Sequence, residues 1–79
     1  MQRYDSDTTV RSVADGIDAT LHSTQVAPGA GWVVEVELHE KNGQKIGSTI
    51  ELGDMSYPTL DDARAAGEAY ARSVVRARG

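Results

Sequence analysis

The chain has 79 residues, a formal net charge of −4 and no cysteine, with one tryptophan and three tyrosines as its only aromatic residues. This length gives one domain, residues 1–79, and a net stability of only about 5 kcal/mol, so any sheet needs a second layer over it. The composition excludes disulfide frameworks, thiolate zinc sites and cysteine nucleophiles, and the acidic charge disfavours bulk attraction to nucleic acid or anionic membranes.

The N-terminal residues and the lengths of the apolar runs bear on the cellular location of the protein. Nothing at the N-terminus resembles a signal peptide. No run approaches the roughly 18 apolar residues of a membrane span. We therefore expect a small, acidic cytoplasmic protein with no membrane partner.

Residues 10–21 allow two interpretations. As strands, they form a hairpin around Asp15-Gly16, a strong signal for a two-residue turn. As a helix, they present an acceptable apolar stripe but carry Gly16 internally, which costs about 1 kcal/mol relative to alanine. A helix would also leave the next hairpin as a marginal two-stranded sheet, so we expect strands and keep the helix as the alternative. The expected pairs are Ala14–Ile17, Ser12–Ala19 and Val10–Leu21.

Residues 32–52 carry the clearest strand pattern, with apolar residues at alternate positions on both sides of Lys41-Asn42-Gly43. A two-residue turn would place the apolar set of one strand beside the polar set of the other. We therefore expect a three-residue loop with Gly43 in the left-handed conformation. The expected pairs are Leu38–Ile46, Val36–Ser48, Val34–Ile50 and Trp32–Leu52.

Residues 59–78 predict an amphipathic helix. Thr59 is the expected N-cap, with Asp62 at the third helical position as in a capping box. One arc of the helix is apolar, and the opposite arc is charged. The apolar arc consists of Leu60, Ala63, Ala66, Gly67, Tyr70, Ala71, Val74 and Ala77, and the charged arc of Asp61, Glu68, Arg72 and Arg76.

Small residues leave a shallow dent in the apolar face of this helix. We expect Trp32 to fill the dent beneath Ala63 and Gly67. We also expect Tyr70 and Val74 to cover the apolar side of the sheet at Val34, Ile50 and Leu52. The residues with expected structural roles are Trp32, Gly43, Thr59, Asp62, Gly67 and Tyr70.

Candidate chemical sites are weak. His22 and His39, with Glu35 and Glu37 near them, share the polar face of adjacent strands but lack the spacing of a metal motif. The acidic patch of Glu35, Glu37, Glu40 and Glu51 lies on a solvated face, whereas acid–base catalysis needs one desolvated carboxyl group. We therefore predict no catalytic residue, no metal site, no cofactor and no enzyme activity.

The C-terminal segment is the one basic part of the chain. Residues 1–58 contain four basic and nine acidic groups, whereas residues 59–79 contain four basic and three acidic groups. Arg72, Arg76 and Arg78 complement the negative end of the helix dipole. They are also the candidate partner surface, for an acidic protein or for nucleic acid.

Two resemblances accompany this pattern. Residues 31–77 resemble small uncharacterised bacterial proteins built from a GW-V-V strand, a hairpin and a YPTLDDA-type helix, a likeness that implies no activity. The segments VEVELHEKNGQKIGSTIEL and TLDDARAAGEAYA also look like the double-stranded-RNA-binding domain, whose αβββα order the alternative N-terminal helix would complete. That domain's last helix begins with paired lysines, whereas Asp61-Asp62 stand here and would repel phosphate.

The sequence thus predicts an α+β fold: an antiparallel meander of about four strands covered on one face by a C-terminal helix. An αβββα or αββα order is the alternative. For function, we expect a small non-catalytic protein-interaction or accessory protein that binds another protein or, as a homodimer, itself. A nucleic-acid-associated module using the basic end of the helix is the alternative.

Overall fold

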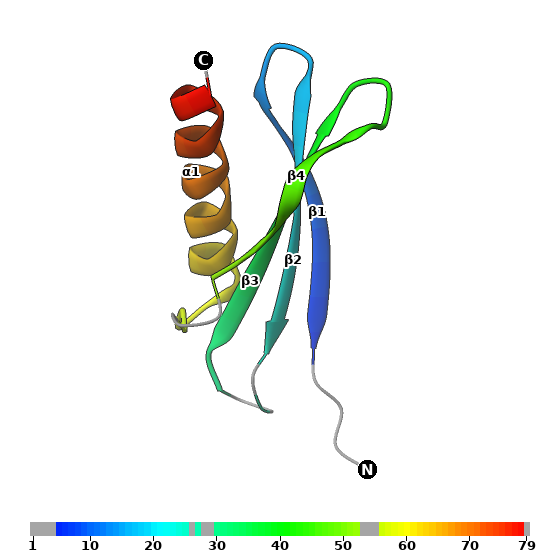
Figure 1. Ribbon diagram of the computed structural model, residues 1–79. Coiled ribbons are helices and arrows are strands. Elements are labelled where there is room, and N and C mark those ends of the chain that lie inside the picture. The colour runs from blue at the N-terminus through cyan, green and yellow to red at the C-terminus, as the bar shows by residue number, and fades with distance from the viewer. Residues whose placement is uncertain (1–4, 26, 28–29, 53–55, 79) are drawn as a thin grey trace.

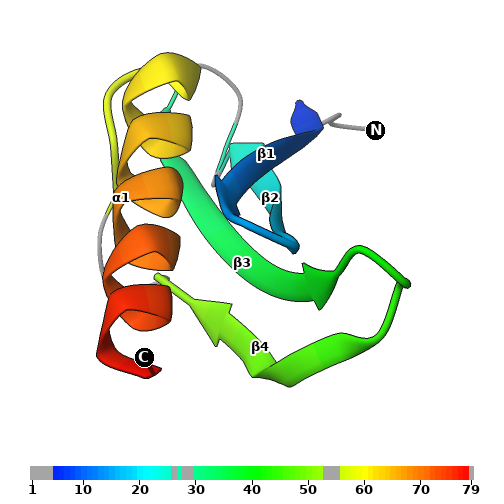
Figure 2. The same cartoon turned by 90° about the horizontal axis from the view of Figure 1, so that it is seen from above.

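The computed structural model describes residues 5–25, 27, 30–52 and 56–78. It is an α+β fold in which one antiparallel sheet, with its strands in chain order, carries one helix across one face (Figures 1 and 2). This confirms the expected fold class, and the alternative N-terminal helix is wrong. None of the described residues form a helix of the length and apolarity that crossing a bilayer requires. The elements are β1 (Ser6–Ala14), β2 (Ile17–Gln25), β3 (Trp32–Glu40), β4 (Lys45–Glu51) and α1 (Leu60–Arg78).

The β1–β2 hairpin begins as predicted and then departs from the expected register. Gly16 has a φ of 75°, and Ala14 pairs with Ile17 across the two-residue turn. A bulge between Ser12 and Ala14 then shifts the pairing by one residue, so Ala19 faces Arg11 instead of Ser12. The expected Val10–Leu21 pair is wrong for the same reason. A one-residue shift reverses the faces, which leaves Val10 57% exposed and turns Val13 inward.

The β3–β4 hairpin also keeps its predicted turn and changes register beyond it. Gly43 has a φ of 93° in a three-residue loop, and Leu38 pairs with Ile46. Beyond Gly47, which has a φ of 68°, β4 holds two extra residues, so Val36 faces Ile50. A shift of two residues preserves the faces, and it places an apolar residue where the uniform register would have placed Ser48. The expected pairs Val36–Ser48, Val34–Ile50 and Trp32–Leu52 are therefore wrong.

Helix α1 starts at a cap that the sequence indicates. The backbone N–H of Asp62 donates to Oγ1 of Thr59 over 3.1 Å, and the N–H of Ala63 donates to the carbonyl oxygen of Thr59. These contacts satisfy N–H groups that a first helical turn cannot bond internally. The cap fixes where the helix begins and so which residues face the sheet.

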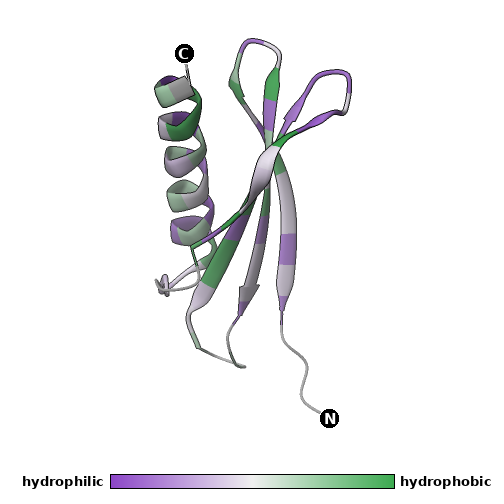
Figure 3. Ribbon diagram, in the orientation of Figure 1, coloured by the Kyte–Doolittle hydropathy of each residue, from purple (hydrophilic) through white to green (hydrophobic). Residues whose placement is uncertain are grey.

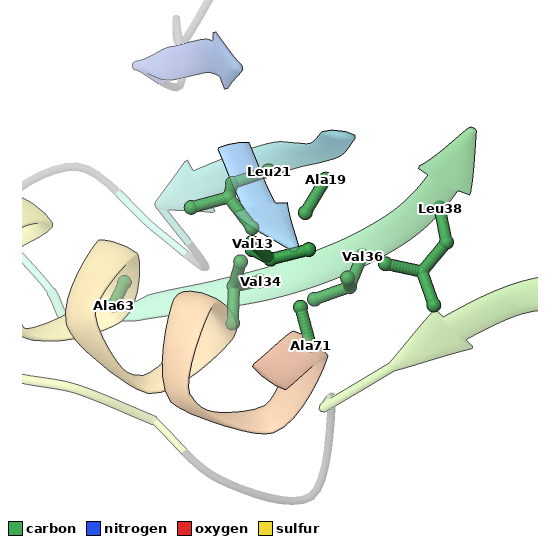
Figure 4. Close-up of a cluster of buried hydrophobic side chains, with 8 residues drawn as sticks. All are labelled: Val13, Ala19, Leu21, Val34, Val36, Leu38, Ala63 and Ala71. Carbon is green, nitrogen blue, oxygen red and sulfur yellow. The ribbon is translucent and has the colours of Figure 1, made fainter. Parts of the chain in front are cut away.

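The core is thin and built from small side chains on α1 that lie over larger ones on β2 and β3. Leu21, Val34 and Val36 are almost completely buried, and a Cβ added to Gly67 would lie 3.1 Å from both Leu21 Cδ2 and Val34 Cγ2. Leu21 and Val34, rather than the expected Trp32, therefore lie against the dent in the helix. Figure 4 shows the buried cluster, which consists of Val13, Ala19, Leu21, Val34, Val36, Leu38, Ala63 and Ala71.

The helix is also rotated relative to the predicted orientation. Tyr70, expected to cover the sheet, is 41% exposed, and Ala77 is exposed too. Glu68, expected on the charged side, is only partly exposed. This side of the helix lies against β1, whose polar residues form ion pairs with it.

Trp32 has a different role, at the end of the sheet. Its backbone N–H donates to the carbonyl oxygen of Tyr57 over 2.7 Å, and the N–H of Tyr57 donates back over 2.8 Å. This isolated bridge joins the segment before α1 to β3. Trp32 is partly buried against the core and so helps to set how the chain approaches the helix.

Ser23 is the one buried polar side chain of the described core, with an exposed fraction of 0%. Its Oγ has no hydrogen-bond partner within the described part of the chain. A buried hydroxyl without a partner is destabilising, so we expect Ser23→Ala to raise the free energy of unfolding by about 1 kcal/mol. Urea denaturation measures the change, with Ser48→Ala at an exposed strand position as the control. A loss of stability in Ser23→Ala alone would contradict this expectation.

Candidate functional site

The helix-facing side of β1 is polar and tied to α1 by charge. Nη2 of Arg64 lies 2.9 Å from Oδ1 of Asp7, and its Nε donates to Oδ2 over 3.1 Å. The hydroxyl of Thr9 also donates to Asp7, over 2.7 Å. The hydrogen bond from Thr9 and then that from Arg64 hold the pKa of Asp7 below its ordinary value. Asp7 is therefore ionised at neutral pH.

A second charged cluster follows along the same side. Nε of Arg11 lies 3.6 Å from Oε1 of Glu68, and Glu68 also pairs with Arg72 at 2.9 Å. Nη1 of Arg72 donates to the carbonyl oxygen of Val13 over 3.4 Å, and its Nη2 to that of Ser12 over 3.3 Å. Sequence reasoning missed Asp7, Thr9 and Arg11. Their spacing of two is the available signal, because it places all three on one face of a strand.

These contacts change the interpretation of the predicted basic surface. Arg72 anchors the bulged end of β1 to α1 and is shared with Glu68. Arg76 is exposed and forms no ion pair with any described residue, and the side chain of Arg78 lies outside the described part. Beside Arg72 lies a shallow hollow of about 250 Å³, open to solvent and lined by Ala65, Glu68, Ala69 and Arg72. Of the two predicted arginines whose side chains the structure describes, Arg72 is therefore bound within the fold and Arg76 is exposed.

The uncovered face of the sheet carries the histidines and acids singled out in the sequence. Nε2 of His22 lies 3.5 Å from Oε2 of Glu37, and Nζ of Lys45 lies 4.0 Å from Oε1 of Glu37. Burial raises the pKa of Glu37, but the hydrogen bond from His22 and the charge of Lys45 outweigh it, so the net pKa is lowered. His39 pairs with Asp18, four residues along the sheet from His22. Across the described residues, no group of three potential metal ligands forms.

Glu35 and Glu51 lie directly opposite each other on neighbouring strands. The hydrogen bond to Glu51 raises the pKa of Glu35 above its ordinary value of 4.5, with burial and the Glu51 charge adding to the shift. This pKa is higher in the folded than in the unfolded chain. The contribution of the pair to the free energy of unfolding therefore falls as pH rises through the interval just above 4.5.

We therefore expect Glu51→Gln to raise the free energy of unfolding at pH 7 by about 0.2–1 kcal/mol, since opposed like charges are destabilising. The same variant should weaken the fall in stability between pH 4.5 and pH 7. Urea titrations across this range measure both effects, with exposed Glu40→Gln as the matched control. Parallel pH profiles for wild type and Glu51→Gln would contradict the account.

The outer edge of β1 is one of the two edges of the described sheet. The N–H of Gln25 donates to the carbonyl oxygen of Asp5, which makes Asp5–Gln25 a hydrogen-bonded pair of the antiparallel ladder. Because such pairs alternate, the backbone groups at odd positions 7, 9 and 11 face β2, and those at even positions face outward. No described strand pairs with that outer side. The outward residues are Ser6, Thr8, Val10 and Ser12.

The opposite edge, along β4, is less suited to pairing. Its register is broken near Gly47, so the strand is divided into two short stretches. Lys45 and Glu51 form non-hydrogen-bonded pairs with β3, so the backbone groups of these two charged residues face outward along this edge. A break in register and edge charges both oppose strand addition. In β1 the bulge lies next to the hairpin turn, so the run from Ser6 to Ser12 is regular. Figure 3 shows this run as mostly pale or purple.

Comparisons with protein-family models, with curated proteins and with solved structures give no significant match. The topology expected from the bacterial-protein resemblance is present, while the family itself stays a prediction. The αβββα order of the double-stranded-RNA-binding domain is absent from the described elements, which run ββββα.

Proposed function

We propose that this chain is a small non-catalytic protein-interaction protein that binds another polypeptide by strand addition to the outer edge of β1. The proposal rests mainly on the backbone N–H and C=O groups at Thr8, Val10 and their neighbours. These groups face outward in a regular run, and no described strand pairs with them. Strand addition uses main-chain hydrogen bonds for affinity and alternate side chains for specificity. Ion pairs to α1 hold β1 in place, so the edge is ready before a partner arrives.

The nucleic-acid alternative has less geometric support. It requires Arg72, Arg76 and Arg78 to present free charge, but Arg72 already binds Glu68 and two carbonyl groups. The uncovered sheet face adds Glu35, Glu37 and Glu51, which would repel phosphate. We therefore keep protein binding as the proposed function.

A tagged pull-down from native-host lysate with nuclease treatment tests this proposal. The decisive comparison is between wild type, Val10→Pro and Glu51→Pro. Each proline removes an outward N–H, at β1 or at β4, and proline is tolerated at such edge positions. The expected result is a protein that survives nuclease, is lost with Val10→Pro and is retained with Glu51→Pro. Recovery that disappears with nuclease, or with Arg76→Ala/Arg78→Ala, would overturn the proposal in favour of nucleic acid.

A further inference from the structure

We infer that the polypeptide bound at this edge is a second copy of the same chain, paired antiparallel to β1 with Thr9 on the twofold axis. The inference rests on the proposed function and adds the identity of the partner and the register. It places the two sheets in one continuous antiparallel sheet with both helices on the same face.

The backbone supports this register. With Thr9 on the axis, Thr8 faces Val10 of the second copy, and Ser6 faces its Ser12. All of these residues have outward N–H and C=O groups, so each pair exchanges two hydrogen bonds. Thr9 then faces its own counterpart in a non-hydrogen-bonded pair, where the two Cα atoms are about 4.5 Å apart. The ladder ends on each side at the bulge that follows Ser12 of one of the two copies.

The charged side chains favour the register centred on Thr9 over the registers centred on Thr8 and on Val10. Asp7 and Arg11 flank Thr9 by two residues on the helix-facing side, so Asp7 of each copy faces Arg11 of the other. Centring the pair on Val10 instead places Asp7 opposite Val13 and loses both charge pairs. Centring it on Thr8 leaves Asp7 opposite Thr9 and moves the partner of Arg11 to Asp5, which lies before the start of β1. Opposed unlike charges stabilise a strand pair, and like charges destabilise it.

The contacts to α1 extend this complementarity across the axis. Within one copy, Arg64 binds Asp7, and Arg11 lies near Glu68, which binds Arg72. Joining Asp7 to Arg11 of the second copy links these into an alternating row of positive and negative groups. The side chain of Arg11 is 47% exposed, so it is free to reach across the edge. One chain thus supplies both the acidic and the basic residue of each charge pair, so the β1 edge is complementary to itself.

Sedimentation velocity on the full chain tests self-pairing. Wild type should be dimeric, Val10→Pro monomeric with an unchanged circular-dichroism spectrum, and Glu51→Pro dimeric. We expect Val10→Pro to raise the dissociation constant of the dimer at least about 100-fold. Each copy loses the hydrogen bond that the N–H of residue 10 donates across the interface, and the proline ring occupies that place. A monomeric wild type at about 1 mM, or a dimer lost in Glu51→Pro and kept in Val10→Pro, would overturn the inference.

Cysteine substitution tests the register and does not depend on how proline is tolerated. The chain has no cysteine, so each single substitution reports without background. In a glutathione buffer, Thr9→Cys should form an intermolecular disulfide at least about tenfold faster than Thr8→Cys or Val10→Cys. The reason is that the latter two are diagonal neighbours of their counterparts, about 7–8 Å apart, which is beyond the usual Cα–Cα distance of a disulfide. Equal rates at the three positions, or a faster rate at Thr8 or Val10, would overturn the register.

Failure here is distinguishable from failure of the proposed function. If wild type is monomeric but captures a host protein that Val10→Pro does not, self-pairing is wrong and strand addition stands. If Val10→Pro captures that protein as well as wild type does, strand addition at β1 is itself wrong.

Discussion

Replacing Gly67 with valine is expected to lower the free energy of unfolding by about 1–3 kcal/mol, although valine is the better helix former. A Cβ at this position would lie 3.1 Å from Leu21 Cδ2 and from Val34 Cγ2, and 3.5 Å from Val36 Cγ2. The two further methyl groups of valine have no free volume between α1 and the sheet. The helix must move outward or the sheet side chains must leave their preferred rotamers.

The matched control is Ala65→Val, which places the same side chain at an exposed position of the same helix. Its expected cost is less than about 0.7 kcal/mol, the difference in helix propensity. Chemical denaturation of both variants gives the comparison. If Gly67→Val is no less stable than Ala65→Val, the close approach of α1 to β2 and β3 is wrong.

Truncating Leu21 to alanine is expected to cost about 2–5 kcal/mol, the largest single-residue effect in this core. Leu21 has an exposed fraction of 0% and is among the largest fully buried side chains of the described residues. Its removal leaves a cavity beneath Gly67 that the small residues of α1 cannot fill. With a total stability of about 5 kcal/mol, this variant approaches unfolding at room temperature. Urea titration at reduced temperature measures it.

The double variant Leu21→Ala/Gly67→Val tests whether the two sites share one space. Valine at position 67 points toward the volume that Leu21 Cδ2 vacates, so the double variant should lose less stability than the sum of the single variants. Leu21→Met is the conservative control, with an expected cost below about 1.5 kcal/mol. Strictly additive effects would show that Leu21 and Gly67 do not pack together.

The sequence was sufficient for elements whose signals are local. Asp15-Gly16 and Lys41-Asn42-Gly43 each predict the turn that forms, because the turn needs a positive φ that glycine adopts without steric cost. Thr59 likewise predicts the start of α1. Period-two alternation predicts which residues of β3 are buried, and Val34, Val36 and Leu38 are.

Register and side-chain pairing depend on contacts that alternation alone does not reveal. Gly47 carries a signal for a bulge, since glycine inside a strand often marks one, but its outward position also fits a regular strand. The bulge before Ala14 turns Asp7, Thr9 and Arg11 toward α1. Asp7 and Arg11 form ion pairs with α1, and Tyr70 is exposed. Predicting this orientation of the helix requires the position of β1 relative to α1.

Amide hydrogen exchange, followed residue by residue by NMR at several protein concentrations, tests pairing at the β1 edge most directly. The amides of Asp7, Thr9 and Arg11 face β2 and should be protected at every concentration. The amides of Thr8 and Val10 face outward, so their protection should rise with concentration towards that of Thr9. Rapid exchange of Thr8 and Val10 at all concentrations, beside a protected Thr9, would contradict self-pairing through this edge.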